Sequence, residues 1–386
     1  MSLKRFAVGD LSENSSFDSA IYLDGKYILL SPETPLTADL ISRLRRWGFH
    51  HILSEGDLKK APALQATSQP DTTTSLLDTD IKEKQKTEEA QKLYYTLLNF
   101  TKDLYKQFRE ANKLNLAELT ERIKDLIQSI KAGRDFILRF MQLHYPSENY
   151  LIQHSVNSTI LALAIGDILK LPPHKLIELG ISALLHELGM GKLPESIYTA
   201  ERALTDEEKK MIKAHTVLGY RLLKSFSVSE DIALSALEHH ERLDGSGYPQ
   251  GLKGDKITLF AKILAVACSY DAIISLRPFK ASADGHRAIL DLLKNRQVHY
   301  DEGIIRALIY CLSLFPIGSL VLLANHSVAR VVKTDPSSPK TPFVHLVIDE
   351  NGNRPSEPVL LKTSPDKGLQ ILRGLRKEEI QSLNLV

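Results

Sequence analysis

The chain has 386 residues, of which 43% are hydrophobic and 25% are charged. This composition is that of a globular protein with two or three domains, and it excludes disordered, collagen-like and disulfide-rich chains. The 49 basic and 47 acidic residues give a net charge of +2, which argues against binding to polymeric nucleic acid or to a membrane surface.

The cysteines and the uncharged segments bear on the location of the protein. The two cysteines, Cys268 and Cys311, cannot form a disulfide framework, which favours a reducing cytoplasm. No apolar segment typical of a signal peptide follows Met1. The longest uncharged stretch, residues 308–327, is interrupted by Pro316. We therefore predict a cytoplasmic protein with no membrane span.

The first segment, residues 1–57, is predicted to form a small α/β module. Asp24-Gly25 lies between two apolar runs and is typical of a β-hairpin turn. A helix is expected over residues 37–47, followed by a strand over 49–53. Residues 58–81 contain prolines and threonines and few large apolar side chains, which predicts a linker.

From residue 82 the spacing of the apolar side chains becomes helical. Residues 82–145 are predicted to form a helical hairpin or connector, and more helices follow within 146–315. Beyond that point the apolar period shortens, which predicts a β-rich appendage over 316–386. Its expected strands are residues 320–323, 329–332 and 343–348. The predicted fold class is mostly α, with the small α/β module at one end and the β-rich appendage at the other.

Histidines recur on the apolar stripes of the predicted helices between residues 154 and 240. They are His154, His186 (followed by Glu187), His215 and the pair His239-His240. A single histidine on such a stripe is usually a hydrogen-bonded core residue, but this explanation would have to hold at four separate stripes. Burying five imidazoles and a carboxylate costs free energy unless the side chains coordinate a metal ion. These donors suit Fe, Mn, Zn, Co or Ni, and the absence of a cysteine cluster argues against a structural zinc site.

Two other motif assignments do not fit this sequence. His186-Glu187 lacks the second histidine of a zincin, because position 190 is Met. The glycine loop at 244–249 is followed by no Gly-Lys-Ser/Thr, so it is not a phosphate-binding P-loop. Instead, this loop would place backbone amides and the Tyr248 phenol beside the presumed metals.

Together these motifs resemble an HD-GYP domain, a bacterial subclass of the HD phosphohydrolases. The resemblance covers residues 150–315, a little under half of the chain. Its elements are His154-Ser155-Val156-Asn157, His186-Glu187-Leu188-Gly189, Leu193-Pro194-Glu195, Leu204-Thr205-Asp206-Glu207-Glu208, His215, His239-His240-Glu241, Asp244-Gly245-Ser246-Gly247-Tyr248-Pro249, Gly251-Leu252-Lys253-Gly254 and Arg277-Pro278-Phe279. They follow the order and the approximate spacing of the family, and it is their combination that is specific. Residues 1–57 resemble, more weakly, the small N-terminal module of some relatives.

The resemblance implies a helical domain with two divalent transition-metal ions, most often iron or manganese, with zinc, nickel or cobalt as alternatives. It also implies hydrolysis of cyclic di-GMP to pGpG or GMP, since two metals can neutralise a phosphodiester and activate water. The positions that match metal ligands are His154, His186, Glu187, His215, His239, His240 and Cys268. The catalytic residues would be His186, Glu187 and His215, with Glu187 bridging the metals. The substrate would be bound by Gly247, Tyr248, Pro249, Arg277 and Lys280, the last two through phosphate groups.

Three departures from the family pattern concern the metal ligands. Glu187 stands where the family has Asp and adds a methylene, which can displace a bridging oxygen. Cys268 stands where the family has an Asp ligand, and a thiolate can still bind a metal. Tyr150 replaces the glutamate that completes a third metal site in some members, so we expect two metals at most. Asp271 matches a second acidic position and could approach the centre.

A fourth departure removes a cation and leaves the activity open. Met190 replaces a lysine that contacts the scissile phosphate, and Lys192 is expected to point elsewhere. The first hypothesis is a metal-dependent phosphodiesterase for cyclic di-GMP with weak or full activity. The second is a degenerate domain that binds the nucleotide, or a signalling protein, without turnover. A third is an HD hydrolase for another nucleotide or phosphoester. The helices at 82–131 also leave a homodimer open.

Overall fold

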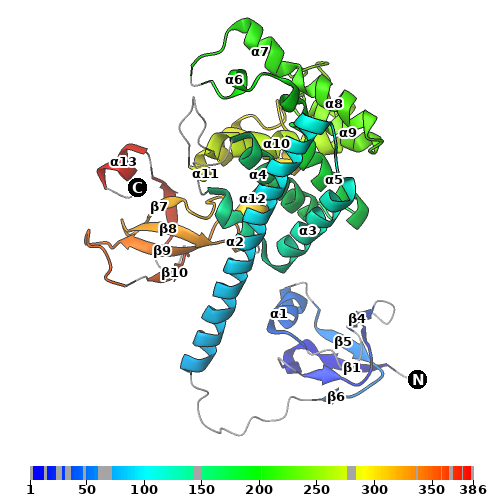
Figure 1. The fold of residues 1–386 in the computed structure, drawn as a ribbon. Helices are drawn as coiled ribbons and strands as arrows, with labels where there is room; N and C mark the ends of the chain where they lie inside the picture. The colour runs from blue at the N-terminus through cyan, green and yellow to red at the C-terminus, as the bar shows by residue number, and fades with distance from the viewer. Residues whose placement is uncertain are drawn as a thin grey trace. The chain divides into compact units, whose positions relative to one another are not determined.

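The computed structural model describes residues 3–12, 15–22, 28–30, 36–46, 49–59, 72–142, 150–200, 202–275, 284–335, 338–357, 359–364, 368–375 and 377–383. The chain divides into two compact units, Met1–Thr79 and Asp80–Val386. Helices dominate the second unit, which ends in a sheet, and a smaller sheet forms the first unit (Figure 1). The predicted fold class, mostly α with strands towards both ends, is confirmed.

The first unit is built on a four-stranded antiparallel sheet. Its strands are, in spatial order, β1 (Lys4–Ala7), β5 (His51–Ser54), β3 (Ile21–Tyr22) and β4 (Ile28–Leu30), and β2 (Ser16–Phe17) pairs separately with β6 (Leu58–Lys59). The helix α1 (Ala38–Arg46) buries Ile41 and Leu44 in the same core as Ile21 and Ile52. The predicted helix and the pairing of β3 with β4 are confirmed, whereas the Asp24-Gly25 turn lies outside the described residues.

The helix α2 (Thr72–Ala111) begins earlier than the sequence predicted. We expected a linker over 58–81, but β6 includes residues 58 and 59, and α2 is already helical at Thr72. Residues 60–71 lie outside the described part of the chain. Threonine is a favoured residue at helix starts, and the Lys, Glu and Gln residues that follow Asp80 are good helix formers. The helix therefore forms even where its apolar period is weak.

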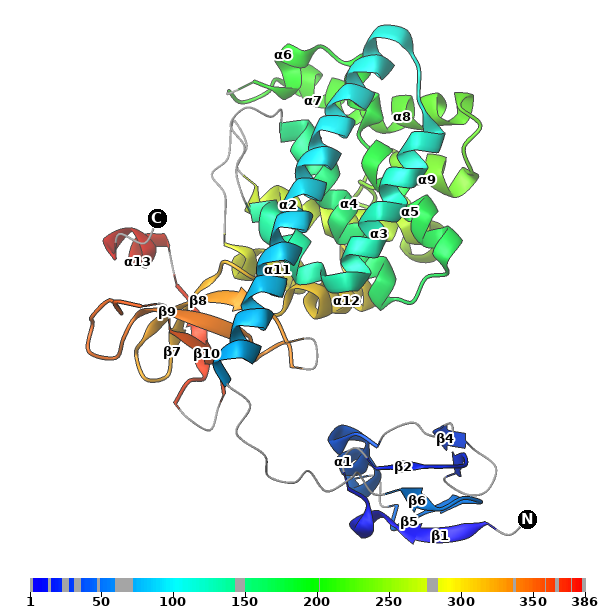
Figure 2. The ribbon, with the colours of Figure 1, turned by 60° about the horizontal axis from the view of Figure 1, so that its bottom comes forward.

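The other helices of the second unit follow one another along the chain. They are α3 (Leu116–Leu138), η2 (Arg139–Gln142), α4 (Tyr150–Ile168), α5 (Pro173–Leu185), η3 (Leu188–Lys192), α6 (Glu195–Tyr198), α7 (Asp206–Lys213), α8 (His215–Ser225), α9 (Glu230–Glu238), η4 (Gly254–Lys256), α10 (Leu259–Ile274), α11 (Gly285–Lys294) and α12 (Glu302–Leu312). Figure 2 shows α2 and α3 running side by side along this helical body. Among the described helices, none is both long and apolar enough to cross a bilayer.

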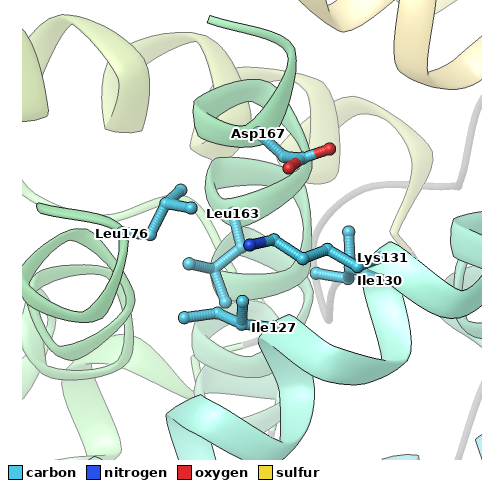
Figure 3. A pocket seen from close by; sticks show the side chains of 6 residues that line it. All are labelled: Ile127, Ile130, Lys131, Leu163, Asp167 and Leu176. Carbon is cyan, nitrogen blue, oxygen red and sulfur yellow. The ribbon is translucent and has the colours of Figure 1, made fainter. Parts of the chain in front are cut away.

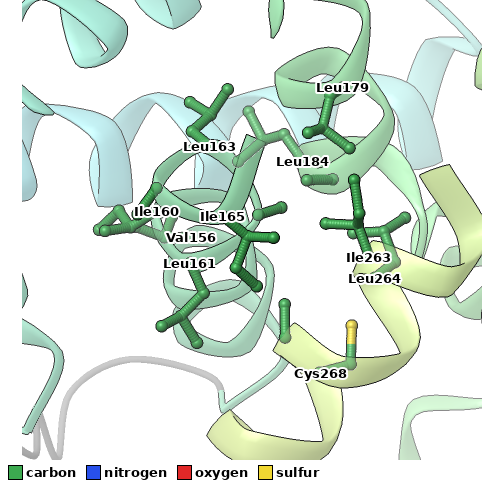
Figure 4. Close-up of a cluster of buried hydrophobic side chains, with 14 of the residues drawn as sticks. Val156, Ile160, Leu161, Leu163, Ile165, Leu179, Leu184, Ile263, Leu264 and Cys268 are labelled. Atoms are coloured by element: carbon green, nitrogen blue, oxygen red, sulfur yellow. The ribbon is translucent and has the colours of Figure 1, made fainter. Parts of the chain in front are cut away.

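The helix α4 lies inside the second unit. Its residues 151–166 are all buried, because α3, α5, α10 and α12 pack around it. A helix without an exposed face requires such an enclosed position. Figure 4 shows apolar side chains from α4, α5 and α10 converging in this core, with Cys268 among those of α10. His154 is therefore carried by a fully enclosed helix, close to the helix that carries Cys268.

The short helix η3 packs tightly against α8 at Gly189. A methyl group on Gly189 would overlap the carbonyl oxygen of His215 and come within 2.7 Å of the Gly219 nitrogen. Only glycine allows this approach of two backbones. The contact brings Glu187, which precedes η3, beside His215, which opens α8.

The second unit ends in a five-stranded antiparallel sheet of order β10-β9-β8-β7-β11. Its elements are β7 (Leu320–Leu323), β8 (Val328–Lys333), β9 (Phe343–Ile348), β10 (Leu360–Lys362) and β11 (Ile371–Gly374), followed by α13 (Lys377–Ser382). The three strands predicted within 320–348 are confirmed. The Asp135 carboxylate accepts hydrogen bonds from Thr334 N and Oγ1, and Arg139 donates to Val332 O at 3.0 Å. These contacts fix the sheet to the end of α3 and to η2.

We expect Gly189→Ala to destabilise the protein and Gly191→Ala to be tolerated. The methyl group at 189 meets backbone atoms, so the free energy of unfolding should fall by about 2 kcal/mol or more. A methyl group at 191 meets only the Phe108 ring, at 3.7 Å, which is an ordinary van der Waals distance. Denaturant unfolding of both variants measures the difference. Equal stability of the two would contradict the close packing of η3 on α8.

Candidate metal centre

Histidines, a carboxylate and a thiol from five parts of the second unit come together. His154 lies on α4, His186 and Glu187 follow α5, His215 opens α8, His239 and His240 follow α9, and Cys268 lies on α10. The sequence had predicted all seven as metal-type positions. The fold thus brings together side chains that lie up to 114 residues apart in sequence, from His154 to Cys268.

These side chains form two groups with closely spaced donor atoms. The first group is His154, His186 and Cys268, and the second group is Glu187, His215, His239 and His240. Within each group all donor atoms lie within 4.8 Å of one another. All seven side chains are buried except His240, which is partly exposed. Each group has enough donors to hold a metal ion.

Glu187 belongs to the second group and also faces the first. Its Oε1 is 3.9 Å from His154 Nε2 and 3.8 Å from His186 Nε2, whereas its Oε2 is 3.5 Å from His215 Nε2. Oε2 is buried and accepts no hydrogen bond from the residues that the structure describes. A buried carboxylate oxygen without a donor is costly. The oxygen therefore has the surroundings expected of an atom that binds a metal ion.

Backbone carbonyls three residues earlier in the chain orient three of the histidines. The Nδ1 atoms of His186, His215 and His239 lie 2.7, 2.6 and 3.0 Å from carbonyl oxygens three residues earlier. Each Nδ1 donates its proton there, so in the neutral ring Nε2 carries a lone pair. The Nε2 atoms of His215 and His239 are only 3.2 Å apart. Two lone pairs repel at this distance unless a proton or a metal ion lies between them.

The charges in the second group follow from burial and from neighbouring rings. Burial raises the pKa of Glu187, but the nearby histidines, His215 first, outweigh it and lower the pKa to about 2. Burial, and then repulsion from other histidines, holds the pKa values of His239 and His240 well below the usual value. At neutral pH Glu187 is therefore a carboxylate and His239 and His240 are neutral imidazoles, which are the forms that bind metals.

The first group is a thiolate beside histidines. Cys268 Sγ is 3.3 Å from His186 Nε2. Burial raises the pKa of the Cys268 thiol, but His186 and His154 outweigh it and lower the pKa to about 6. Burial lowers the pKa of His154, whereas its hydrogen bonds to Asp271 and Cys268 raise it to about 10. A metal ion bound by this group would displace the proton from His154 Nε2.

Asp271 approaches the centre from behind. Its Oδ2 is 2.6 Å from His154 Nδ1, the nitrogen that faces away from Glu187. The sequence had placed Asp271 near the centre without a defined role. Its carboxylate fixes the tautomer and the orientation of the His154 ring and is not part of either donor group.

The loop that follows the histidine pair is held in place by Glu241. Its buried carboxylate accepts hydrogen bonds from the backbone nitrogens of Gln250, Gly251 and Leu252, at 2.7, 3.1 and 3.0 Å. The sequence alone assigns no role to Glu241, although its position directly after two metal-type histidines is a signal for one. The same short segment thus carries two donors of the second group and the anchor of the loop.

The loop places Tyr248 against the second group. The Tyr248 ring stacks on His240, with ring centroids 4.7 Å apart and an interplanar angle of 19°. Gly247 makes this possible, because a methyl group there would overlap backbone atoms of residues 240–242. Pro249 is exposed beside it. The Lys213 ammonium lies 5.2 Å from the centroid of the Tyr248 ring, and no sequence motif pointed to this cation.

The other positions that the sequence singled out are Met190, Lys192, Arg277 and Lys280. Met190 is buried in the main apolar core, and the Lys192 ammonium lies 4.7 Å from the centroid of the Phe108 ring. The expectation that Lys192 points elsewhere is thus confirmed. Arg277 and Lys280, predicted to hold phosphates, lie outside the described residues.

A pocket between α3, α4 and α5 is unrelated to this cluster. It is lined by Ile127, Ile130, Lys131, Leu163, Asp167 and Leu176 (Figure 3). Four of these six side chains are aliphatic, and none belongs to the two donor groups. The pocket therefore offers no comparable set of metal-binding atoms.

Several known proteins are similar to this chain. Residues 141–304 match the HD domain family, and residues 320–383 match a KOW domain associated with HD domain. The chain is 30% identical over 296 residues to cyclic di-GMP phosphodiesterase PdeB of Borreliella burgdorferi, covering 76% of this chain and 78% of that protein. It is 30% identical over 253 residues to cyclic di-GMP phosphodiesterase PA4108 of Pseudomonas aeruginosa, covering 65% and 61% respectively. The solved structure of Bd1817, an HDG"Y"P protein from Bdellovibrio bacteriovorus, is 15% identical with a TM-score of 0.49, covering 80% of this chain and 98% of that chain.

We expect His186→Ala and His215→Ala each to lower the content of bound transition metal, because each removes a donor from one group. His174→Ala is the matched control, since His174 is exposed and belongs to neither group. Elemental analysis of protein desalted after metal loading gives the metal content per chain. Full metal content in both variants would contradict the assignment of the two groups as metal sites.

We expect Glu241→Gln to loosen the loop at residues 244–256. The exchange removes the negative charge and turns an amide donor towards backbone N–H donors, a loss of about 1.5–3 kcal/mol for charge-assisted hydrogen bonds. Trypsin should then cleave after Lys253 at least about 10-fold faster. Glu230→Gln is the control, because Glu230 is exposed and bonds to Lys224 and Tyr220 only, among the described residues. Equal cleavage rates would show that Glu241 does not anchor the loop.

Proposed function

The chain belongs to the HD-GYP family of HD-domain phosphohydrolases, and from this premise we propose that it is a metal-dependent phosphodiesterase acting on cyclic di-GMP. The observation that carries the proposal is the position of Glu187, with one carboxylate oxygen towards each donor group. A carboxylate shared in this way is what a two-metal phosphodiesterase needs. The names of the relatives support a cyclic dinucleotide as the substrate.

Two divalent ions are proposed as cofactors, one in each donor group. The first would be held by His154, His186, Cys268 and Glu187 Oε1, and the second by Glu187 Oε2 together with His215, His239 and His240. Such ions neutralise a phosphodiester and lower the pKa of water. Iron or manganese is the first choice, with zinc, nickel or cobalt as alternatives. The sulfur of Cys268 shifts the first group towards the softer of these metals.

The residues of the chain would bind and orient the substrate. Tyr248, fixed by its stacking on His240 and by the Glu241 anchor, would line the substrate pocket together with Gly247 and Pro249. Lys213 would bring positive charge to the same loop. Arg277 and Lys280 remain predicted phosphate contacts. A cytoplasmic location fits a centre whose Cys268 is a free thiol.

One observation favours the second function, in which the domain binds the nucleotide or a signalling protein without turnover. Met190 lies in the apolar core, and Lys192 faces Phe108, so neither supplies a cation to the centre. Transition-state charge on the phosphate is then stabilised less than in relatives that have a lysine there. An HD hydrolase for another phosphoester, protein partners and a homodimer also remain open.

The decisive experiment measures binding and turnover separately. The full chain, loaded in turn with iron, manganese, nickel and zinc, is assayed for hydrolysis of cyclic di-GMP and of other cyclic dinucleotides. Binding of cyclic di-GMP is measured in parallel by calorimetry. Binding with turnover supports the phosphodiesterase, and binding without turnover supports the degenerate domain. Selective turnover of a different dinucleotide would replace the proposed substrate.

We expect the wild-type protein to turn over slowly, and Met190→Lys combined with Cys268→Asp to raise turnover at least about 10-fold, or about 1.4 kcal/mol of barrier. The change restores a cation and a hard carboxylate ligand at positions that act mainly on the transition state. Cys311→Ser is the control for loss of a buried thiol away from the donor groups. Fast wild-type hydrolysis that falls in the double variant would mean that Cys268 is a working ligand as it stands. Thermal unfolding of each variant shows whether the introduced lysine side chain disrupts the core around position 190.

A further inference from the structure

A chain of hydrogen bonds connects α2 to the metal-type residue His154. The Tyr94 hydroxyl on α2 donates to Asn157 Oδ1 at 2.8 Å. Asn157 Nδ2 donates to Asp271 Oδ1 at 2.8 Å, and His154 Nδ1 lies 2.6 Å from Asp271 Oδ2. Tyr94, Asn157 and Asp271 are each 0% exposed.

The direction of these bonds follows from their chemistry. An ionised carboxylate can only accept hydrogen bonds, so Asn157 must turn its NH₂ group towards Asp271. The amide oxygen of Asn157 then faces Tyr94, whose hydroxyl must be the donor. Replacing the hydroxyl by hydrogen would leave a buried amide oxygen without this donor, which the network could relieve only by moving Asn157 and Asp271.

His154 depends on this network more than the other histidines depend on theirs. His186, His215 and His239 bond through Nδ1 to backbone carbonyls three residues earlier in the chain. Among these four histidines, His154 is the one whose Nδ1 bonds to a side chain from another helix. Tertiary contacts therefore set the orientation of the His154 ring, and with it the direction in which Nε2 points towards His186 and Cys268.

We propose that Tyr94 is a positioning residue for His154, acting through Asn157 and Asp271, so that α2 sets the affinity of the first group for its metal ion. This inference rests on the proposed metal centre. Tyr94 lies outside the segment that matches the HD domain, residues 141–304. The helix α2 begins at Thr72, in the first unit, and Tyr94 lies on its part in the second unit. One continuous helix thus connects the chain after the N-terminal sheet to the Tyr94 hydroxyl.

A second tyrosine of α2 supplies the matched control. The Tyr105 hydroxyl is also buried, and it lies 3.2 Å from Ser155 Oγ and donates to Leu184 O at 3.1 Å. Within the described part of the chain, its hydrogen bonds reach neither Asn157 nor Asp271. Tyr105→Phe and Tyr94→Phe thus make the same chemical change on the same helix, and only one of them breaks the path to His154.

The test is a cobalt(II) titration of the full chain after metal removal. A cobalt ion bonded to the Cys268 thiolate absorbs in the near ultraviolet, so this band reports the first group separately from the second. Removing a group that orients a metal ligand directly costs roughly 10–100-fold in metal affinity. For Tyr94→Phe, two links further away, we expect the band to require about 3–10-fold more cobalt. Tyr105→Phe should titrate like the wild type.

A double-mutant cycle separates positioning from general destabilisation. Asp271→Asn by itself should raise the cobalt concentration that the thiolate band requires. Adding Tyr94→Phe to Asp271→Asn should raise it no further, because both residues act on one path. Asn157→Ser interrupts the path at its middle and should repeat the Tyr94→Phe result, which keeps the test valid should one variant fold poorly. Thermal unfolding of the metal-free proteins controls for stability.

The outcomes distinguish this inference from the proposed function. The role of Tyr94 would be overturned, and the proposed function left intact, by either of two results. In the first, the wild type shows the thiolate band and Tyr94→Phe needs no more cobalt to reach it. In the second, the losses of cobalt affinity in Tyr94→Phe and Asp271→Asn add up in the double variant. A wild type that binds cobalt without the band would instead remove Cys268 from the metal centre, and the inference with it. A selective loss in Tyr94→Phe and Asn157→Ser, absent from Tyr105→Phe, supports it.

Discussion

The arrangement of the second unit depends on one buried carboxylate, Glu187, placed between two sets of imidazoles. Its two oxygens face different groups, and Oε2 accepts no hydrogen bond from the described residues. Burying such a group requires positive charge close to it, from protonated histidines or from metal ions. The end of α5, the start of α8 and the close contact at Gly189 all serve to keep Glu187 and His215 together. The apolar core around α4 supplies the enclosure in which these charges act on one another strongly.

The ligand-type histidines are held in two different ways, and this has consequences for control. A ring bonded to a carbonyl three residues earlier in the chain keeps its orientation as long as that turn of backbone is intact, which applies to His186, His215 and His239. A ring bonded to Asp271, as His154 is, keeps its orientation only while α10 and the residues around it stay in register. Rigid-body movement of helices would therefore affect the first group before the second.

Many features of this centre can be predicted from local sequence patterns. The features that cannot be predicted in this way depend on tertiary packing. Histidines at helical spacing and the strands after residue 319 are local patterns, so they predicted the elements, the five histidines and Glu187, whereas Cys268 was predicted from the resemblance to the family. The grouping into two sets, the position of Asp271 behind His154 and the hydrogen bond from Tyr94 depend on which helices pack together, and no local pattern encodes that. The early start of α2 at Thr72 was missed because its first turns lack an apolar stripe.

The departures from the family pattern change where positive charge can come from. A lysine at position 190, which the resemblance to the family implies, would bring a cation from the turn that carries Glu187, but in this chain Met190 packs in the core and Lys192 lies over Phe108. Lys213, at the end of α7, instead brings an ammonium to the Tyr248 ring. An anion bound at the loop would thus meet charge from the side of His215 and not from the side of Met190. Because Lys213 is exposed, its charge is screened by water and contributes less to a developing phosphate charge than a buried lysine would.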